Sequence, residues 1–365
     1  MKILFILPRY HTNYIEVFKS LLIKGYKIKL CVYNFGLIED HKFIKPEYVQ
    51  PSFLTKFLNF FFRFKLNKYY LPKINDFNKI LSNFSPDIVI MRPYSKLFTI
   101  FILILRIFNK FELIFYHQTD DQNLKSFNFS IKFFKFFLIN QILRIKSYSP
   151  LFKESKIFFS KKLYYLPFVS NIRLTRNKKL KQNKFLMIGK FLRKKNHEMF
   201  VRGIEFLNEN FDIKATIIGE ASSLEQKKEF LRIKKLIMKL KLDNKITLIK
   251  NINYKNIKKF YYKNDFFVLP TDHDPAPYSI LEAMSHGCMV LCSSSCGTKN
   301  YIRKNLNGFT FENNNQLSLN KNMLKMINNK KKFFKNKKKN DLYLNKCLSR
   351  KNFNSFFEKL IKKRK

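Results

Sequence analysis

The chain has 365 residues, more than one ordinary hydrophobic core organises, so its length predicts two domains. Hydrophobic residues make up 46% of it, which excludes a disordered chain, and five cysteines are too few for a disulfide framework. Lysine and arginine together number 72 against 25 aspartates and glutamates, and the net charge of +47 attracts nucleic acid or an anionic membrane surface.

The first residues imitate a secretory signal peptide, but Ile3–Leu7 is too short for the apolar region and no small-residue cleavage site follows. We expect a buried first strand there. The most apolar later stretch, Leu97–Phe108, contains Arg106 and is shorter than the roughly 20 residues that span a bilayer. The sequence therefore predicts no transmembrane helix, and we expect a cytoplasmic protein.

Short apolar runs alternate with longer helical patterns, as in parallel sheets covered by helices. The first series of runs predicts strands at Lys2–Leu7, Lys27–Val32, Ile88–Met91, Leu113–His117 and Tyr164–Leu166. The second predicts strands at Phe185–Ile188, Lys214–Ile218, Ile246–Ile249, Phe266–Leu269 and Met289–Leu291. Helical patterns include Asn13–Ile23, Lys195–Leu207, Ser223–Leu240 and Lys255–Tyr262. Two such series predict an α/β protein with two Rossmann-like, doubly wound domains.

The same alternation predicts where the domains begin and end. Residues 1–170 form the first domain, the polar and basic stretch 171–184 is the linker, and residues 185–345 form the second domain. Residues 346–365 follow as a basic C-terminal segment with an amphipathic pattern. The run of Lys, Asn and Phe at Asn328–Lys339 favours disorder or a solvated helix face.

Only eight glycines occur in the chain, and two of them, Gly189 and Gly219, directly follow predicted strands. Glycine at such a turn lets the backbone approach a phosphate closely. After Gly189, Lys190 and Lys195 place cations at the turn and at the next helix start, where lysine is unfavourable for the helix dipole unless an anion is held there. Because the chain is rich in lysine, a chance cluster explains this segment at least as well.

A second cluster follows the predicted strand Phe266–Leu269. Asp274 and Glu282 flank the start of a helix that Pro277 is expected to begin and Gly287 to end. Two carboxylates around one helix start, in a chain with 25 acids, indicate recognition of sugar or ribose hydroxyls. An aspartate that caps the helix and a salt-bridged glutamate are the alternative.

These segments occur in an order that resembles the donor domain of the family 4 glycosyltransferases, which are retaining enzymes of GT-B fold. The matching positions are Gly189-Lys190 with Lys195, Ile217-Ile218-Gly219-Glu220, Leu269-Pro270-Thr271, Asp274 with Glu282-Ala283-Met284-Ser285-His286-Gly287, Gly297-Thr298 and Asn307-Gly308-Phe309. The ordered set covers Phe185–Phe311 and is specific, whereas each motif alone is weak. The first half of the chain matches only in its alternation of predicted strands and helices and in His117, which lies at the end of a predicted strand.

Three departures from the family pattern concern ligand binding. Lys190 stands where the family usually has arginine, so a single ammonium charge replaces a guanidinium that can bind a phosphate through two hydrogen bonds. Asp274 stands where glutamate is usual and is one methylene shorter. Pro8–Asn13 replaces the glycine-rich turn expected near the start, which affects the expected acceptor contacts but not the donor site.

The resemblance implies that Lys190 and Lys195 hold the donor diphosphate and that Glu282 accepts hydrogen bonds from the ribose. Asp274 would bind sugar hydroxyls, and His117 would face the sugar from the first domain, with an ordinary strand-end histidine as the alternative. Lys195, Asp274 and His117 are therefore the expected catalytic residues. The residues expected to bind the donor are Gly189, Lys190, Lys195, Gly219, Glu220, Ala276, Tyr278, Ser279 and Glu282.

The resemblance also implies a nucleotide-sugar co-substrate, no further cofactor and no metal, because lysines neutralise the diphosphate. The acceptor would be a saccharide or a lipid-linked sugar, in cell-surface polysaccharide or lipopolysaccharide assembly. The C-terminal segment 346–365 would form a helix that returns toward the first domain. The basic aromatic stretches Phe53–Tyr70 and Phe129–Lys146 predict peripheral attachment to the anionic inner face of the membrane. Core-facing helices in a phenylalanine-rich chain are the alternative.

Two other functions stay open at this point. A nucleic-acid-binding protein fits the charge of +47, but the basic residues are spread along the chain without a nucleic-acid motif, and AT-rich codons account for most of them. A GT-B protein that binds without turnover is the other alternative. Lys195, Asp274 and Glu282 keep the charges that the family chemistry needs, so we expect an active enzyme with no nucleic-acid partner.

Overall fold

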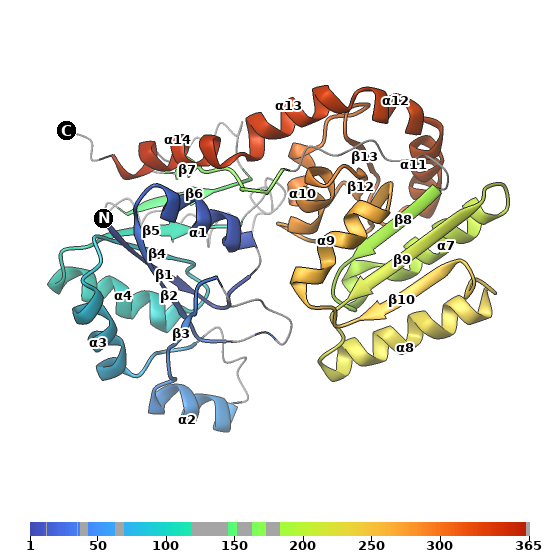
Figure 1. Cartoon of the computed structure of the whole chain (residues 1–365). Coiled ribbons are helices and arrows are strands. Elements are labelled where there is room, and N and C mark those ends of the chain that lie inside the picture. Colours follow the sequence, from blue (N-terminus) through green and yellow to red (C-terminus); the bar gives the residue numbers. More distant parts are fainter. Residues whose placement is uncertain are drawn as a thin grey trace. The chain divides into compact units, whose positions relative to one another are not determined.

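The computed structural model describes residues 1–11, 13–34, 36, 43–62, 69–118, 145–151, 163–172 and 183–362. The chain divides into two compact units, the first formed by Met1–Phe168 with Phe353–Lys365 and the second by Val169–Asn352. Each unit contains one parallel sheet with flanking helices (Figure 1). Most of the predicted linker, 171–184, lies outside the described residues.

Unit 1 is built on a seven-stranded sheet with the order β3-β2-β1-β4-β5-β6-β7, and all its paired strands are parallel. The central strand β1 is paired on both sides, so Ile3 lies opposite Ile28 in β2 and Ile88 in β4. A strand covered on both faces needs a continuous apolar run, which explains the sequence of β1. The strands are β1 (Lys2–Leu7), β2 (Lys27–Val32), β3 (Glu47–Tyr48), β4 (Ile88–Met91), β5 (Glu112–Tyr116), β6 (Lys146–Ser149) and β7 (Leu163–Tyr165).

The helices of unit 1 come from both ends of the chain. Those described are α1 (Asn13–Ile23), α2 (Phe53–Phe62), α3 (Ile74–Phe84), α4 (Lys96–Phe108) and most of α14 (Arg350–Ile361). The hydroxyl of Ser20 in α1 donates to Asn354 in α14 at 2.7 Å. The ammonium of Lys146 in β6 donates to the carbonyl of Leu360 at 2.8 Å. These contacts attach the C-terminal helix to the first unit.

Unit 2 is built on a six-stranded parallel sheet with the order β10-β9-β8-β11-β12-β13. Its strands are β8 (Asn183–Ile188), β9 (Ile213–Gly219), β10 (Ile246–Lys250), β11 (Phe266–Leu269), β12 (Met289–Ser293) and β13 (Gly308–Phe311). Its helical segments are η2 (Arg193–Lys195), α7 (His197–Asn208), α8 (Leu224–Lys239), α9 (Tyr254–Lys263), α10 (Tyr278–Ser285), η3 (Gly297–Tyr301), α11 (Gln316–Asn328), α12 (Lys330–Lys335) and α13 (Lys337–Leu348). Strands β11 and β12 are buried along their whole length and form the centre of the core.

Two local expectations, a helix that starts at Lys195 and a helix that starts at Pro277, were wrong. Lys195 ends a 3₁₀ turn, because Asn196 has a left-handed backbone (φ 52°) that separates this turn from α7. Pro277 precedes the first residue of α10, so it caps the helix and does not begin it. For the lysine-rich run, the alternative of a solvated helix face fits α12, in which Lys331, Lys332 and Lys335 are exposed. Lys330 is the exception: it is buried in an ion pair with Asp265 at 2.9 Å, because a buried carboxylate needs a cation.

The C-terminal helix is expected to stabilise unit 1 through Phe357, which is 1% exposed. Phe357→Ala should lower the free energy of unfolding of unit 1 by about 3–5 kcal/mol, because it leaves a cavity. Phe53→Ala is the control, since Phe53 is 82% exposed and loses the same atoms without leaving a cavity. Denaturant unfolding of the three proteins measures the difference, and equal losses in both variants would contradict the assignment of α14 to the core.

Candidate functional site

Two strand ends of unit 2 approach each other closely at Gly189 and Gly219. A Cβ atom on Gly219 would lie 2.2 Å from the carbonyl oxygen of Gly189 and 2.8 Å from the ring of Phe191, so the fold itself requires glycine there. A Cβ on Gly189 would lie no closer than 3.6 Å to any atom, the nearest being in Lys195. The fold does not explain the glycine at 189, whereas close approach of a ligand would.

Lys190 follows Gly189 and forms an ion pair with Glu220, with 3.0 Å between Nζ and Oε2. The side chain of Glu220 is 6% exposed, and its other oxygen accepts a hydrogen bond from the hydroxyl of Ser222 at 2.7 Å. Lys190 is 39% exposed. A fixed, buried acid therefore holds an accessible cation at the carboxyl ends of β8 and β9.

Lys195 forms an ion pair with Asp274, in which its ammonium donates to Oδ2. The two side chains are 12% and 21% exposed, so water only partly screens their charges. Oδ1 of Asp274 accepts a hydrogen bond from the amide of Ala276 at 3.2 Å. The amide of Gly297 donates to the carbonyl of Asp274 at 3.0 Å, and this loop leaves no room for a Cβ at Gly297. The structure thus joins two predicted site residues that are distant in the sequence.

Glu282 in α10 is largely buried and is held by two phenol groups. The hydroxyls of Tyr254 and Tyr261 donate to its two carboxylate oxygens, the second at 3.0 Å. Burial, together with the charge of Glu282, raises the pKa of Tyr261 well above its ordinary value, so that phenol stays protonated and can donate. A carboxylate has further lone pairs, so Glu282 can still accept a hydrogen bond from a ligand hydroxyl.

The structure also locates the remaining predicted residues. The amide of Ala276 is already bonded to Asp274, and the phenol of Tyr278 donates to the carbonyl of Val169. Ser279 lies in the first turn of α10. His117 lies in unit 1 directly after β5, and its pKa is lowered to about 4, chiefly by burial and then by the charge of Arg92. At neutral pH it is therefore an uncharged hydrogen-bonding group.

A charged network behind the Gly189 turn could not be recognised from the sequence. Glu229 in α8 is 3.3 Å from Arg193 of the 3₁₀ turn and also binds Arg232 at 2.9 Å. Arg232 in turn reaches Glu198 in the first turn of α7. The ring of His197 stacks on Phe191 with 4.8 Å between centroids, and burial lowers its pKa to about 4. These contacts fix the turn that carries Lys190 and Lys195.

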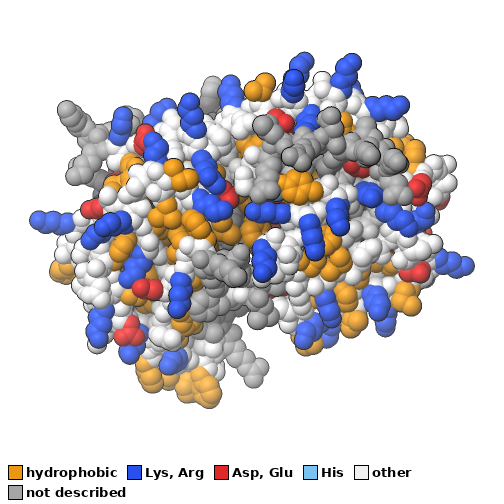
Figure 2. All heavy atoms as spheres, viewed as in Figure 1, with side chains coloured by type: hydrophobic (Ala, Val, Ile, Leu, Met, Phe, Trp, Pro, Cys, Tyr) orange, Lys and Arg blue, Asp and Glu red, His pale blue; other side chains and the backbone are white. Residues whose placement is uncertain are grey.

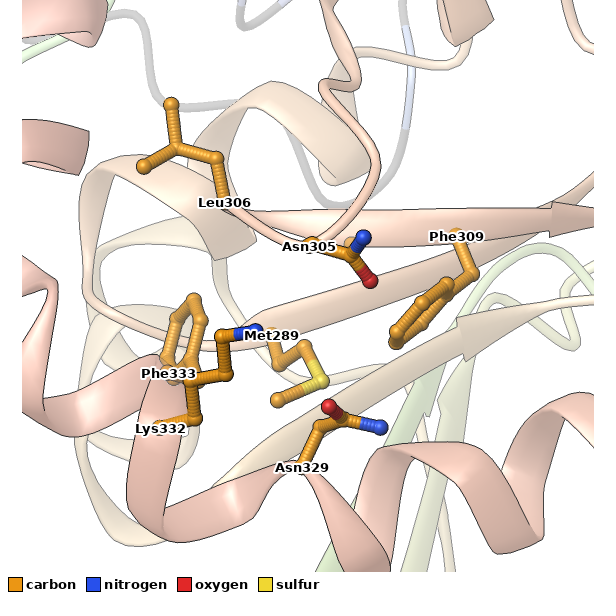
Figure 3. A pocket seen from close by; sticks show the side chains of 8 residues that line it. Met289, Asn305, Leu306, Phe309, Asn329, Lys332 and Phe333 are labelled. Carbon is orange, nitrogen blue, oxygen red and sulfur yellow. The ribbon is translucent and has the colours of Figure 1, made fainter.

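A small hollow in unit 2 lies at the opposite edge of the sheet. It is lined by Met289, Asn305, Leu306, Gly308, Phe309, Asn329, Lys332 and Phe333 (Figure 3). Met289 and Gly308 are the first residues of β12 and β13, whereas the candidate site residues follow the carboxyl ends of their strands. Within the described residues, no group of three or more His, Cys, Asp or Glu side chains could hold a metal ion.

The two parallel sheets and the charged carboxyl edge of unit 2 define a protein of the GT-B class. Residues 169–342 match the family model described as glycosyl transferases group 1. Residues 169–342 therefore form a glycosyltransferase group 1 domain, and the similar solved structures show the GT-B fold for the chain as a whole. A search of curated proteins gave no match.

Solved structures of similar fold match nearly the whole length of the chain. A glycosyltransferase from Rickettsia africae ESF-5 is 16% identical, with a TM-score of 0.74 and coverage of 100% of this chain and 99% of that one. Anabaena HepE in complex with UDP is 13% identical, with a TM-score of 0.72 and coverage of 98% and 99%. WaaG, involved in lipopolysaccharide biosynthesis, is 12% identical, with a TM-score of 0.66 and coverage of 99% and 100%.

The two glycines give a matched test of this geometry. Gly219→Ala should lower the free energy of unfolding, since its Cβ would collide with the Gly189 carbonyl. Gly189→Ala should leave the unfolding free energy within a few tenths of a kcal/mol of the wild type, because its Cβ meets only ordinary contacts. Denaturant unfolding measures both, and a larger loss at 189 than at 219 would contradict the described packing.

Proposed function

We propose that this glycosyltransferase moves a sugar from a nucleotide-sugar donor with retention of configuration, and that unit 2 binds the donor at its carboxyl edge. The observation that carries the proposal is the pairing of Lys195 with Asp274 and of Lys190 with Glu220 beside a glycine that packing does not require. The similar HepE structure is a complex with UDP, which supports a nucleoside diphosphate as the product in this fold.

In the proposed reaction the lysines stabilise the departing diphosphate. Lys195 and Lys190 exchange part of their interaction with Asp274 and Glu220 for the phosphate oxygens, and their charge is worth most when the leaving group becomes more negative. We propose that this electrostatic role needs no metal and no further cofactor. Retention follows from attack on the same face, with the departing phosphate acting as the base.

The other site residues bind the nucleoside and the sugar. Glu282, oriented by Tyr254 and Tyr261, accepts hydrogen bonds from the ribose hydroxyls. Asp274, released from Lys195, binds hydroxyls of the transferred sugar, and neutral His117 contributes a hydrogen bond from unit 1. The residues Gly189, Gly219, Ala276, Tyr278 and Ser279 and the side chain of Glu220 complete the proposed donor site.

The proposed acceptor is a saccharide or a lipid-linked sugar in cell-surface polysaccharide or lipopolysaccharide assembly. The similarity to WaaG, a glycosyltransferase involved in lipopolysaccharide biosynthesis, supports this pathway. We propose that nucleic acid is not a partner. In the view of Figure 2, lysine and arginine are scattered over the visible face and do not form one basic module.

Three substitutions test the roles. Lys195→Ala should lower turnover about 100-fold or more, because one preorganised donor to the leaving group is lost. Glu282→Gln should weaken binding of the bare nucleoside diphosphate, since the ribose loses a charged acceptor. Asp274→Asn should impair sugar transfer without weakening that binding. Calorimetric affinities and donor consumption measure these effects.

Lys194→Ala is the matched control, since the side chain of Lys194 is exposed and carries the same charge. It should leave turnover within about twofold of the wild type. If Asp274 only caps a helix, Asp274→Asn is silent, because asparagine caps as well as aspartate. Full activity in all three variants would show that the site residues are assigned wrongly.

We further propose that α2 places unit 1 on an anionic membrane surface. Phe53, Phe60 and Phe61 are 82%, 80% and 62% exposed, and the last two rings contact each other at 5.3 Å between centroids. The opposite face is anchored by Thr55, whose hydroxyl donates to the carbonyl of Leu71 at 3.0 Å. Figure 2 shows hydrophobic side chains together at the lower edge of the view, over α2.

The chemistry of this surface suits an interfacial contact and not a bilayer crossing. α2 carries the exposed Lys56 and no acid, so its aromatic face borders positive charge. Among the described helices, none has the length and apolar character that a bilayer crossing requires. The second predicted membrane stretch, 129–146, lies almost wholly outside the described residues.

A vesicle assay tests the membrane proposal. The protein should co-sediment with anionic vesicles at low salt and be released at high salt, because each Lys or Arg contributes roughly 1 kcal/mol that salt screens. Replacing both Phe60 and Phe61 by serine should reduce binding several-fold. Leu317→Ser removes an equally exposed apolar residue from unit 2 and should have no effect. Equal binding to neutral vesicles, or no loss in the α2 variant, would contradict the proposal.

A further inference from the structure

The sheet of unit 1 reverses its strand order between β1 and β4. From β1 the chain moves outward to β2 and β3, and it then returns to the other side of β1 to form β4. In open parallel sheets, ligands bind outside the carboxyl ends of the strands at such a reversal. The residues that follow β1 and β4 are therefore the place in unit 1 to look for ligand-binding groups.

Arg92 is the first residue after β4. Its backbone amide donates to the carbonyl of Ile6 in β1 at 3.1 Å, which holds it at the reversal. Its guanidinium lies 5.9 Å from the ring centroid of Tyr94, and its charge lowers the pKa of His117 after the larger effect of burial. Arg92 is half-buried and forms no ion pair with any carboxylate in the described part of the chain.

The described groups that neighbour Arg92 at this edge are basic or neutral. Arg9 follows β1, and its guanidinium lies against Gly36, because a Cβ on Gly36 would be 1.7 Å from Nη2 of Arg9. Burial raises the pKa of Tyr116, at the end of β5, so its phenol stays uncharged, and His117 is neutral as well. None of these groups can neutralise the charge of Arg92.

A half-buried charge without a counter-ion is unfavourable, because it has lost part of its hydration and gained no partner. Such residues persist where they bind a charged ligand, and the planar fork of arginine matches two oxygens of a phosphate or carboxylate. Arg9 lies two residues after the end of β1, so a second arginine is at the reversal.

We infer that unit 1 has an oxyanion-binding site at the reversal between β1 and β4, with Arg92 as its main ligand-binding residue. This site selects an acceptor that carries a phosphate or carboxylate group. The acceptor assignment rests on the proposed glycosyl transfer, whereas binding of the oxyanion itself does not. The two claims can therefore fail separately.

The test uses the full-length Lys190→Ala/Lys195→Ala variant, which removes the cations of the proposed donor site. Inorganic phosphate and acetate are titrated into it by calorimetry. Adding Arg92→Gln should weaken binding of the better probe at least tenfold, and the stronger of the two probes shows whether phosphate or carboxylate is preferred. Lys110→Gln makes the same charge change before β5, at the opposite edge of the sheet, and should leave binding unchanged.

Unfolding measurements separate binding from folding. Because Arg92 has no counter-ion among the described residues, Arg92→Gln should unfold at the same denaturant concentration as the parent or at a higher one. A lower midpoint would make Arg92 a structural residue and overturn the inference. Absence of binding in the parent variant, or equal binding with and without Arg92, would overturn it as well.

Discussion

The ion pair between Lys195 and Asp274 is the contact on which the functional edge of unit 2 depends. It joins the turn after β8 to the loop after β11, and two further bonds act beside it. The hydroxyl of Thr271 and the amide of Asp272 both donate to the carbonyl of Lys194, each at 2.8 Å. The turn and the loop are thus fixed to each other before any ligand arrives, which is the preorganisation that electrostatic stabilisation requires.

The pairing also explains how the chain tolerates cations at this edge. Lys190 and Lys195 each have an acidic partner, so in the free protein neither is an uncompensated charge. In the proposed donor complex, the diphosphate replaces one set of negative oxygens by another, and the acids are then available to accept hydrogen bonds from hydroxyls. Unit 1 differs, because Arg92 has no carboxylate of its own in the described part of the chain. The two proposed anion sites therefore differ, because the cations of unit 2 are paired with acids and Arg92 is not paired within the described residues.

Much of the fold could be predicted because parallel strands buried on both faces leave long apolar runs, as in β1, β4 and β11. The strands β3, β6 and β13 were missed, since β3 has only two residues, β6 carries lysine and serines, and β13 begins with glycine. For these, pairing with a neighbour outweighs local preference.

The candidate site was only partly predictable. The order of the motifs, through their resemblance to the family, pointed to Lys195, Asp274 and Glu282. The contact between Lys195 and Asp274, however, spans 79 positions, and no local sequence pattern specifies it. The phenols that hold Glu282 lie seven positions apart on α9, a spacing that puts Tyr254 and Tyr261 on one helix face, so this signal was present in the sequence.

The most direct test of the central claim is a double-mutant cycle on UDP binding with Lys195→Ala and Asp274→Asn. If Asp274 competes with the diphosphate for Lys195, Asp274→Asn should tighten UDP binding in the wild-type background. The same substitution should change nothing once Lys195 is alanine. An equal effect of Asp274→Asn in both backgrounds would contradict the account, because it would mean that UDP does not bind through the cation that Asp274 holds.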